Sequence, residues 1–160
     1  MLNLFLFEAK FDDCDHFYEL ANDIDVRNVS FNQNSIDYQT HIKWYTEKLN
    51  SINDKLFILK YENNFVGQIR FEIKNDHAIV SISILKKYRG LGYGSIILNK
   101  GCREFWKFFN LDLIAYVKSD NTNSYNLFIK NRFIFNKYLF INNTKAIELK
   151  SKYEETNTNR

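Results

Sequence analysis

Hydrophobic and polar residues alternate along the middle of the chain, from Leu56 to Leu85. This period of two predicts three strands, at 56–62, 65–74 and 78–85, separated by asparagine-containing turns. Such short turns join antiparallel neighbours. The middle of the chain is therefore predicted to be an antiparallel meander.

A polar stripe is predicted on one face of the last two of these strands. If residues 75 and 76 form the turn, the strands pair so that one face carries Gln68, Arg70, Glu72, Ser81 and Ser83. Gln68 then lies opposite Ser83, and Arg70 opposite Ser81. The other face, with Phe71 opposite Val80, is apolar. One side of this hairpin is thus expected to pack in the core, and the other carries polar groups.

The rest of the chain predicts strands that alternate with helices. Further strands are expected at 2–8, 111–117, 133–141 and 145–150. Helices are expected after Asp12 or Asp13, after Ser35 or Asp37, after the glycines of residues 90–94, and at 121–131. Residues 22–35 show no period and predict a loop. The order predicts a mixed α/β (α+β) fold, with a mostly antiparallel seven-stranded sheet flanked by about four helices.

Length and composition favour one domain over residues 1–151, followed by a polar, disordered tail at 152–160. A chain of 160 residues that is 45% hydrophobic can bury one core. The net charge of +3 comes from interspersed charges, which disfavours a nucleic-acid partner. Cys14 and Cys102 lack metal-ligand spacing, so no metal is expected. The apolar start is too short to span a membrane, and a cytoplasmic protein is expected.

Three of the five glycines, Gly90, Gly92 and Gly94, lie where a strand is expected to turn into a helix. Glycines at a helix N-terminus expose backbone N–H groups to a bulky anion, as in a phosphate cradle. A P-loop would need a lysine after Gly94, and none is present. A dinucleotide-binding fingerprint would need glycine at Ser95 or Ile97. Neither of these two motifs fits.

The pattern Arg89-x-x-Gly92-x-Gly94 resembles the acetyl-CoA motif of the GCN5-related N-acetyltransferase (GNAT) superfamily. The predicted order of elements matches the fold of that superfamily along nearly the whole chain. The stretch "NTNSYNLFIKNRF" resembles its second motif, with Asn121, Ser124, Phe128, Arg132 and Phe133 in register. Most of the superfamily has Gly-Phe where this chain has Asn131-Arg132-Phe133, and the simpler interpretation of this ending is an ordinary helix stop, because asparagine tolerates the left-handed conformation.

The resemblance implies acetyl-CoA as the co-substrate. Backbone N–H groups of Leu91 to Ser95 would bind the pyrophosphate, with charge from Arg89, and the backbone of 82–85 would pair with the pantetheine arm opposite Asn121. The residues assigned to acetyl-CoA are Ile82, Ile84, Leu85, Arg89, Gly90, Leu91, Gly92, Tyr93, Gly94, Ser95, Asn121, Ser124 and Phe128. The simpler interpretation of the glycines is a tight loop before a well-packed helix.

Acetyl transfer to an amine needs a neutral amine and a proton for the departing thiolate. In many members of the superfamily a tyrosine of the second motif gives that proton, and this chain has Phe128 there. Water, Tyr125 or Tyr116 can take the role. Glu72 is the candidate base, acting through a water. Its alternative role is that of an exposed strand glutamate paired with Arg70 or Lys74.

The acceptor is expected to be a small amine. Segments such as "VRNVSF", "HIKWYTEKL" and "VGQIRFE" resemble bacterial acetyltransferases of nonulosonate biosynthesis, which N-acetylate a nucleotide-linked 4-amino-dideoxy sugar. Its expected contacts are Arg27, Trp44, Gln68, Arg70, Ser81 and Ser83, because arginine binds phosphate and an aromatic ring stacks on a base or sugar. Trp44 in the core is the alternative, and His41 is expected on the helix surface.

Three other functions stay open at this point. An acetyltransferase of protein N-termini, or one of polyamines or drugs, would favour an acidic pocket, and the polar stripe contains only Glu72. A catalytically silent CoA-binding module is compatible with Phe128. The sequence also leaves the oligomeric state open, a homodimer included.

Overall fold

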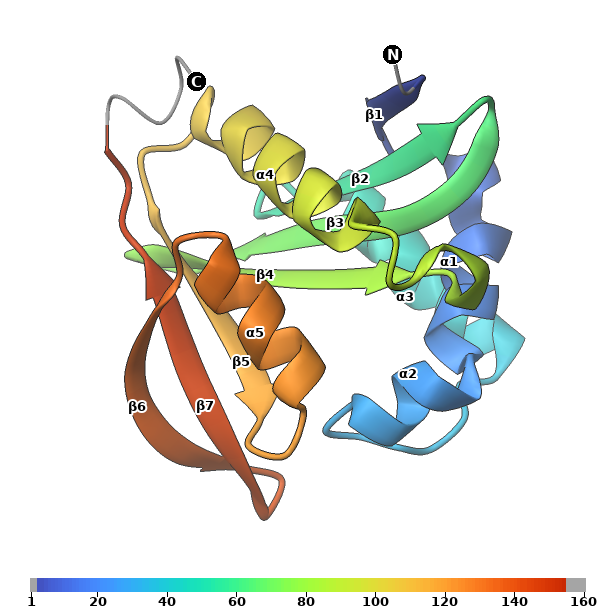
Figure 1. Cartoon of the computed structure of the whole chain (residues 1–160). Coiled ribbons are helices and arrows are strands. Elements are labelled where there is room, and N and C mark those ends of the chain that lie inside the picture. The colour runs from blue at the N-terminus through green and yellow to red at the C-terminus, as the bar shows by residue number, and fades with distance from the viewer. Residues whose placement is uncertain (1–2, 155–160) are drawn as a thin grey trace.

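The computed structural model describes residues 3–154 as a seven-stranded sheet covered by helices on both faces (Figure 1). The strands are β1 (Leu4–Glu8), β2 (Asp54–Tyr61), β3 (Asn64–Ile73), β4 (His77–Ile84), β5 (Asp112–Lys118), β6 (Ile134–Ile141) and β7 (Thr144–Ser151). The helices are α1 (Cys14–Asn22), α2 (Ile24–Val29), α3 (Tyr38–Asn50), α4 (Tyr93–Trp106) and α5 (Thr122–Lys130), with 3-10 turns at Phe11–Asp13 and Lys86–Tyr88.

The sheet has the strand order β1-β2-β3-β4-β5-β7-β6, and all its neighbours are antiparallel except β4 and β5. The predicted fold class and the mostly antiparallel sheet are confirmed. The hairpin of β3 and β4 also has the predicted register, with Gln68 opposite Ser83 and Arg70 opposite Ser81. Period-two patterning and a two-residue turn were sufficient to define this pairing.

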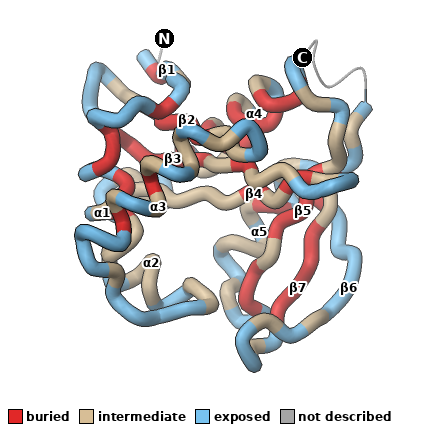
Figure 2. The backbone as a smooth tube through the Cα atoms, turned by 180° about the vertical axis from the view of Figure 1, so that it is seen from behind, coloured by how far each residue is buried: buried red, intermediate tan, exposed pale blue. Residues whose placement is uncertain are grey.

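Two hydrophobic clusters pack on opposite faces of the sheet. Alternate residues of β2 enter different clusters: Phe57 and Leu59 lie with α4 on one face, and Leu56 and Ile58 lie with α1 and α3 on the other. Viewed from behind, the buried positions follow β5 and β7, while β6 at the edge is largely exposed (Figure 2). Because β2 is buried on both faces, its sequence is a nearly continuous apolar run.

Strands β4 and β5 part after a short paired region. Within the described chain, their ladder joins His77–Ile79 to Asp112–Ile114 and continues no further. Beyond it, β5 stays paired with β7 and β4 with β3. The two strands diverge in Figure 1, and α2 lies across the open end between them. This opening is the interruption in an otherwise continuous sheet.

Helix α2 lies inside the segment that was predicted to be a loop, so that prediction was wrong for Ile24–Val29. The Asp23 side chain caps the helix by accepting hydrogen bonds from the backbone N–H groups of Asp25 and Val26. Six residues are fewer than two turns, which is too short for a helical period to appear in the sequence. The described chain therefore has five α-helices instead of about four.

Packed structure continues past the predicted end of the domain at residue 151. The Tyr153 ring lies 6.4 Å from the Trp106 ring, and the Tyr153 N–H donates to Asp112 Oδ1 at 2.9 Å. The predicted tail thus includes residues that pack on the domain. Residues 155–160, like residues 1 and 2, lie outside the described part of the chain.

Candidate active site

The glycine loop forms an open turn directly before helix α4. Gly90 and Gly92 have φ values of +75° and +83°, and Gly92 is the N-cap of α4. A β-carbon built at either glycine would meet nothing within 4 Å. The loop thus leaves space in front of the helix N-terminus, where backbone N–H groups and the helix dipole favour an anion. These features fit the predicted pyrophosphate cradle.

Arg89 beside this loop is already engaged by helix α2. Its Nη1 donates to Asp25 Oδ2 at 2.8 Å, its Nη2 to Asp23 Oδ1 at 3.1 Å, and its Nε to the Ile84 carbonyl at 2.9 Å. Lys86 adds a second ion pair to Asp25 at 3.3 Å. The basic turn therefore connects the loop to α2. A phosphate contact by Arg89 stays a prediction.

The second motif packs helix α5 against the glycine loop. Asn121 is the N-cap of α5, and its Oδ1 accepts from the Ser124 N–H at 3.2 Å. At the other end, Asn131 Nδ2 donates to Ser95 Oγ at 3.0 Å. Phe128 is buried, with its ring 4.9 Å from that of Phe133. The motif thus fixes α5 beside the start of α4.

The end of helix α5 differs from the prediction at one residue. Asn131 has a φ of −104°, and the left-handed residue is Arg132, with a φ of +70°. The side chain of Asn131 instead joins helices α4 and α5, because it also accepts from Asn99 Nδ2 at 2.8 Å. The helix does stop at this ending, with Asn131 as its C-cap, but Arg132 takes the left-handed conformation.

The end of β4 and the residue after it line the opening between β4 and β5. Ile82, Ser83, Ile84 and Leu85 are all half-buried. On the β5 side their backbone has no strand partner within the described chain. A free strand edge can pair with an extended ligand through backbone hydrogen bonds. This edge begins next to the glycine loop, as the predicted pantetheine site requires.

Polar side chains form a row across the sheet where β4 and β5 part. Ile79 and Ile114 are the last paired residues, so Ser81 and Tyr116, each two positions further, share one face at the same level. Arg70 lies opposite Ser81 on β3, and Glu148 lies opposite Tyr116 on β7. The row runs from β3 to β7, with the opening at its centre.

Tyr116 lies directly opposite Glu148 on β7, and the Glu148 carboxylate acts on its hydroxyl. Burial first, and then the charge and hydrogen bond of Glu148, raise the pKa of Tyr116. Glu148 is only 5% exposed and also accepts from Asn136 Nδ2 at 2.5 Å. Tyr125, the other tyrosine candidate, is half-buried against the core cluster on the α4 face.

Three cations approach the same face of the sheet. The Arg70 guanidinium lies 5.2 Å from the centre of the Trp44 ring. Burial lowers the pKa of Arg70, and the charge of Arg27 adds to this effect, although Glu72 and Asp54 oppose it. Burial also lowers the pKa of Arg27. The third cation is the buried Lys118, whose Nζ donates to the Asn28 carbonyl at 3.0 Å.

Two buried polar atoms on this face have no hydrogen-bond partner among the described residues: Arg27 Nε and Gln68 Oε1. Leaving such atoms unpaired costs about 1–3 kcal/mol each. The rest of the Arg27 guanidinium donates to Ser30 Oγ and to the carbonyls of Asn32 and Asn34. The donor at Arg27 and the acceptor at Gln68 are thus available to a ligand.

The structure brings Glu72 near Arg70, two residues away on the same face of β3, but keeps it far from Ser83. Glu72 lies opposite Ile79, at the paired end of β4, and Ser83 is four residues further along that strand. At about 3.3 Å per residue this places Glu72 roughly 13 Å from the level of Ser83. Its side chain is 42% exposed and pairs with Lys74 and, at 3.8 Å, with Lys48. Its role as base stays a prediction.

Sequence reasoning missed Glu148, Lys118 and the aspartates of α2. Glu148 lies in a predicted strand, and Lys118 directly follows one; alternation along a strand marks the buried position but not the partner. A charged residue within an otherwise apolar strand was the available signal for both. His41, expected on the helix surface, is 1% exposed, and its Nε2 lies 3.1 Å from the Cys14 carbonyl, so that expectation was wrong.

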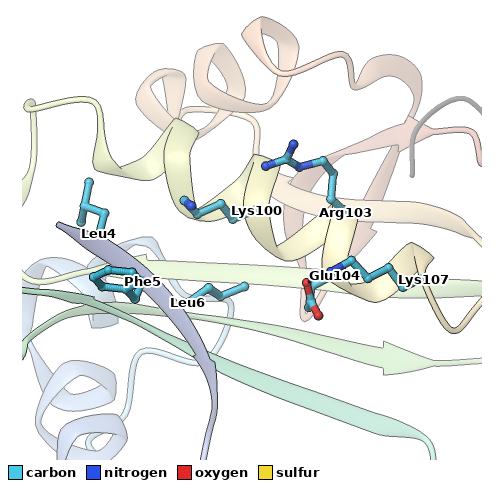
Figure 3. Close-up of a pocket in the computed structure, with 7 residues that line it drawn as sticks. All are labelled: Leu4, Phe5, Leu6, Lys100, Arg103, Glu104 and Lys107. Atoms are coloured by element: carbon cyan, nitrogen blue, oxygen red, sulfur yellow. Dashed lines mark hydrogen bonds and ion pairs between the residues drawn. The ribbon is translucent and has the colours of Figure 1, made fainter. Parts of the chain in front are cut away.

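A separate hollow lies between β1 and the outer side of α4 (Figure 3). Leu4, Phe5 and Leu6 line it from the strand, and Lys100, Arg103, Glu104 and Lys107 line it from the helix. None of the predicted site residues lies in it. Among residues 3–154, no helix is long and apolar enough to span a membrane, and no cluster of three or more metal-ligating side chains occurs.

An open glycine turn at a helix N-terminus, continued by a free strand edge, is suited to an extended, phosphorylated ligand. The chain belongs to the acetyltransferase (GNAT) family, whose sequence model matches residues 15–132. No curated protein matches the sequence. The family assignment makes the chain an acetyl-CoA-dependent N-acetyltransferase.

Solved structures share the fold at low sequence identity. A spermidine N-acetyltransferase from Vibrio cholerae, in complex with CoA and spermine, has a TM-score of 0.84 and 17% identity, covering 93% of this chain and 95% of that one. The yncA protein of Salmonella typhimurium, with its cofactor acetyl-CoA, has a TM-score of 0.78 and 16% identity, covering 96% and 95%. A candidate phosphinothricin N-acetyltransferase has a TM-score of 0.80 and 21% identity, and the match covers 95% of this chain and 99% of that one.

Proposed function

We propose that this acetyltransferase acetylates an amine whose molecule also carries an anionic group, and that the acceptor is a nucleotide-linked 4-amino-dideoxy sugar. The amine would enter from the face of the sheet that carries Arg27, Arg70 and Lys118. The diphosphate of the nucleotide would lie near the two arginines. This acceptor would place the enzyme in the biosynthesis of bacterial surface or flagellar glycans.

The observation that carries this proposal is the cationic character of the acceptor face. The Arg70 guanidinium lies over the Trp44 ring, and Arg27 is close enough for its charge to lower the pKa of Arg70. Half-buried cations that repel each other, like Arg27 and Arg70, are stabilised when an anion lies between them. The buried atoms without partners, Arg27 Nε and Gln68 Oε1, supply one donor and one acceptor for such a ligand.

The proposed donor site uses the glycine loop and the free edge of β4. The pyrophosphate of acetyl-CoA would bind the backbone N–H groups of residues 91–95, and the pantetheine arm would run along residues 82–85 toward Ser81. In this arrangement the acetyl group lies at the point where β4 and β5 part. Arg89 would contribute charge, and Asn121 would contact the arm from the side of α5.

Polyamine acetylation is the competing function, because a structural neighbour binds spermine. A polyamine is a polycation, and its site gains from carboxylates. On the acceptor face here, Glu148 is buried beside Tyr116, and Glu72 is paired with lysines. The surplus of positive charge therefore favours an anionic acceptor over a polyamine.

The test is acetyl-CoA consumption with a panel of acceptors. The panel contains UDP-linked 4-amino sugars, phosphinothricin, spermidine and N-terminal peptides. We expect turnover with a nucleotide sugar and none with spermidine. Turnover with spermidine or peptides alone would overturn the sugar proposal. Failure to bind acetyl-CoA in calorimetry would instead contradict the donor site.

A charge variant tests the role of the cations separately. Arg70→Gln removes the charge beside Trp44, and we expect the KM for the nucleotide sugar to rise by roughly tenfold or more, the range for a lost charged hydrogen bond. Lys43→Gln is the matched control, because Lys43 is exposed on the same helix as Trp44. Equal KM values for both variants would remove Arg70 from the acceptor site.

A further inference from the structure

We propose that Tyr116 and Glu148 form a proton relay for acetyl transfer, in which Tyr116 contacts the reacting amine and Glu148 takes its proton through Tyr116. Tyr116 is then a catalytic residue, and Glu148 is a positioning residue and proton store that acts through it. This inference rests on the proposed donor site, but it does not depend on which amine is the acceptor.

The position of Tyr116 on the open sheet places it at the reaction centre. β4 and β5 are parallel and pair last at Ile79 and Ile114. Tyr116 is the first residue of β5 beyond this pair on the acceptor face, level with Ser81. A pantetheine arm that runs from the glycine loop back along β4 ends at this level. The thioester would then lie between Ser81 and Tyr116.

Glu148 lies between Tyr116 on β5 and polar side chains of β6. The two residues are direct cross-strand neighbours. On the other side, Asn136 Nδ2 donates to Glu148 Oε1, and Lys137 Nζ lies 3.8 Å from Oε2. Lys150, on the same strand, is a further cation whose pKa the Glu148 charge helps to raise, after the larger effects of Asp112. These donors stabilise a buried carboxylate that would otherwise be costly.

The chemistry of the two paired groups sets the direction of proton movement. A phenol can donate its proton to a carboxylate, and the lone pairs of its oxygen remain available to accept a proton from the amine. Burial and then Glu148 raise the pKa of Tyr116, so the phenol is protonated at neutral pH. A protonated tyrosine between an amine and a carboxylate is what a relay requires.

The chemical step balances with a single proton. The neutral amine nitrogen attacks the thioester carbon, an N–C bond forms, and the carbonyl electron pair moves to oxygen. The nitrogen gives a proton to Tyr116 Oη as the tyrosine gives its own to Glu148. Collapse of the oxyanion then breaks the C–S bond, and the proton returns from Glu148 through Tyr116 to the thiolate. The products are the amide and CoA, and both residues regain their starting states.

This relay explains how the site can work with Phe128. The hydroxyl that this position supplies in many members of the superfamily is absent, and Phe128 is buried against Phe133. A single tyrosine on β5 serves here as proton acceptor in the first half of the reaction and as donor in the second. The chain then needs neither a hydroxyl at position 128 nor a base at Glu72.

The experiment compares Tyr116→Phe, Glu148→Gln and the double variant, with whichever amine the acceptor panel identifies. Failure of the nucleotide-sugar proposal therefore leaves this test intact. We expect each single variant to lower kcat by about 10²-fold, the lower range for general acid–base catalysis, with unchanged acetyl-CoA affinity in calorimetry. The kcat of the double variant should be no lower than that of either single variant, because both residues act in one relay.

The pH profile separates a relay from a structural role. The pH dependence of kcat should differ between the wild type and Glu148→Gln, because a glutamine at this position cannot take up the proton. Tyr138→Phe and Glu104→Gln are controls, since both side chains lie outside the site and should leave kcat unchanged. A wild-type pH profile in Tyr116→Phe, or multiplicative losses in the double variant, would overturn the relay. If Glu148→Gln does not fold, the kcat and pH profile of Tyr116→Phe alone test the relay.

Discussion

Asp25 and Arg89 are 64 positions apart in the sequence, yet Asp25 Oδ2 and Arg89 Nη1 lie 2.8 Å apart. This ion pair holds the first turn of α2 against the glycine loop. At the other end of α2, the Asn28 carbonyl accepts from Lys118 on β5. The helix is thus anchored on both sides of the opening between β4 and β5, and it carries Arg27 into the acceptor face.

Breaking this ion pair should affect the acceptor more than the stability of the fold. For Asp25→Asn we expect a loss of less than about 1 kcal/mol in the free energy of unfolding, because both side chains are partly exposed to solvent. The acceptor KM should rise several-fold, since α2 is loosened. Steady-state kinetics and urea unfolding measure the two effects. Glu104→Gln removes a comparable pair with Lys107, and an equal KM change there would contradict the prediction.

Gly92→Ala should weaken acetyl-CoA binding. The φ of +83° at the N-cap of α4 costs a residue with a β-carbon about 1–2 kcal/mol, so the loop is expected to relax away from its open shape. We expect the acetyl-CoA Kd, measured by calorimetry, to rise by roughly tenfold, as 1.4 kcal/mol implies. Asn143→Ala is the strain control, because Asn143 has a φ of +59° in the turn after β6. It should lower stability without changing this Kd.

Arg132→Gly should stabilise the protein. Arg132 has a left-handed φ of +70° directly after α5, a conformation that glycine adopts without a β-carbon clash. We expect the free energy of unfolding to rise by up to about 1 kcal/mol. The substitution relieves the backbone strain in the folded state, but glycine also gives the unfolded chain more conformational entropy, which offsets part of the gain. Lys130→Gly, two residues earlier and within the helix, should destabilise by about 1 kcal/mol. If urea unfolding shows that both variants change the free energy of unfolding in the same direction, the prediction is contradicted.

His41 should make stability depend on pH below neutrality. Burial lowers the pKa of His41 in the folded protein, against the opposing effects of the Cys14 carbonyl and Asp15. Above about pH 6.5 the imidazole is neutral in both states and the stability is complete. As the pH falls from there toward the lowered folded pKa, only the unfolded chain binds the proton, and stability is lost with a slope of at most about 1.4 kcal/mol per pH unit.

The variant His41→Gln tests this dependence, because a glutamine amide can still donate to the Cys14 carbonyl but cannot titrate. Urea unfolding at several values between pH 7 and pH 5 should give a shallower decline for the variant than for the wild type. Parallel declines would show that other groups cause the pH dependence. The substitution can also lower the free energy of unfolding by the same amount at every pH, and such a loss does not change the slope of stability against pH.

Local patterning and motif spacing determined most of the fold and the donor side of the site. Alternation from Leu56 to Leu85 defined the β3–β4 register, because a slip of one residue would move the apolar face into solvent. The spacing of Arg89, Gly92 and Gly94 indicated the loop before α4, because the required backbone conformation is a local property. Helix α2 was missed because its one strong local signal, the Asp23 cap, precedes only six residues.

The tertiary structure decided which polar residues meet. Arg89 faces Asp25, Lys118 reaches Asn28, and Tyr116 faces Glu148, and none of these pairs follows from a period or a short motif. Each depends on strand order and on the parting of β4 and β5, which are set by the packing of the whole sheet. The sequence by itself therefore determined the elements and the acetyl-CoA motif, whereas long-range packing decided which charged and polar side chains meet where β4 and β5 part.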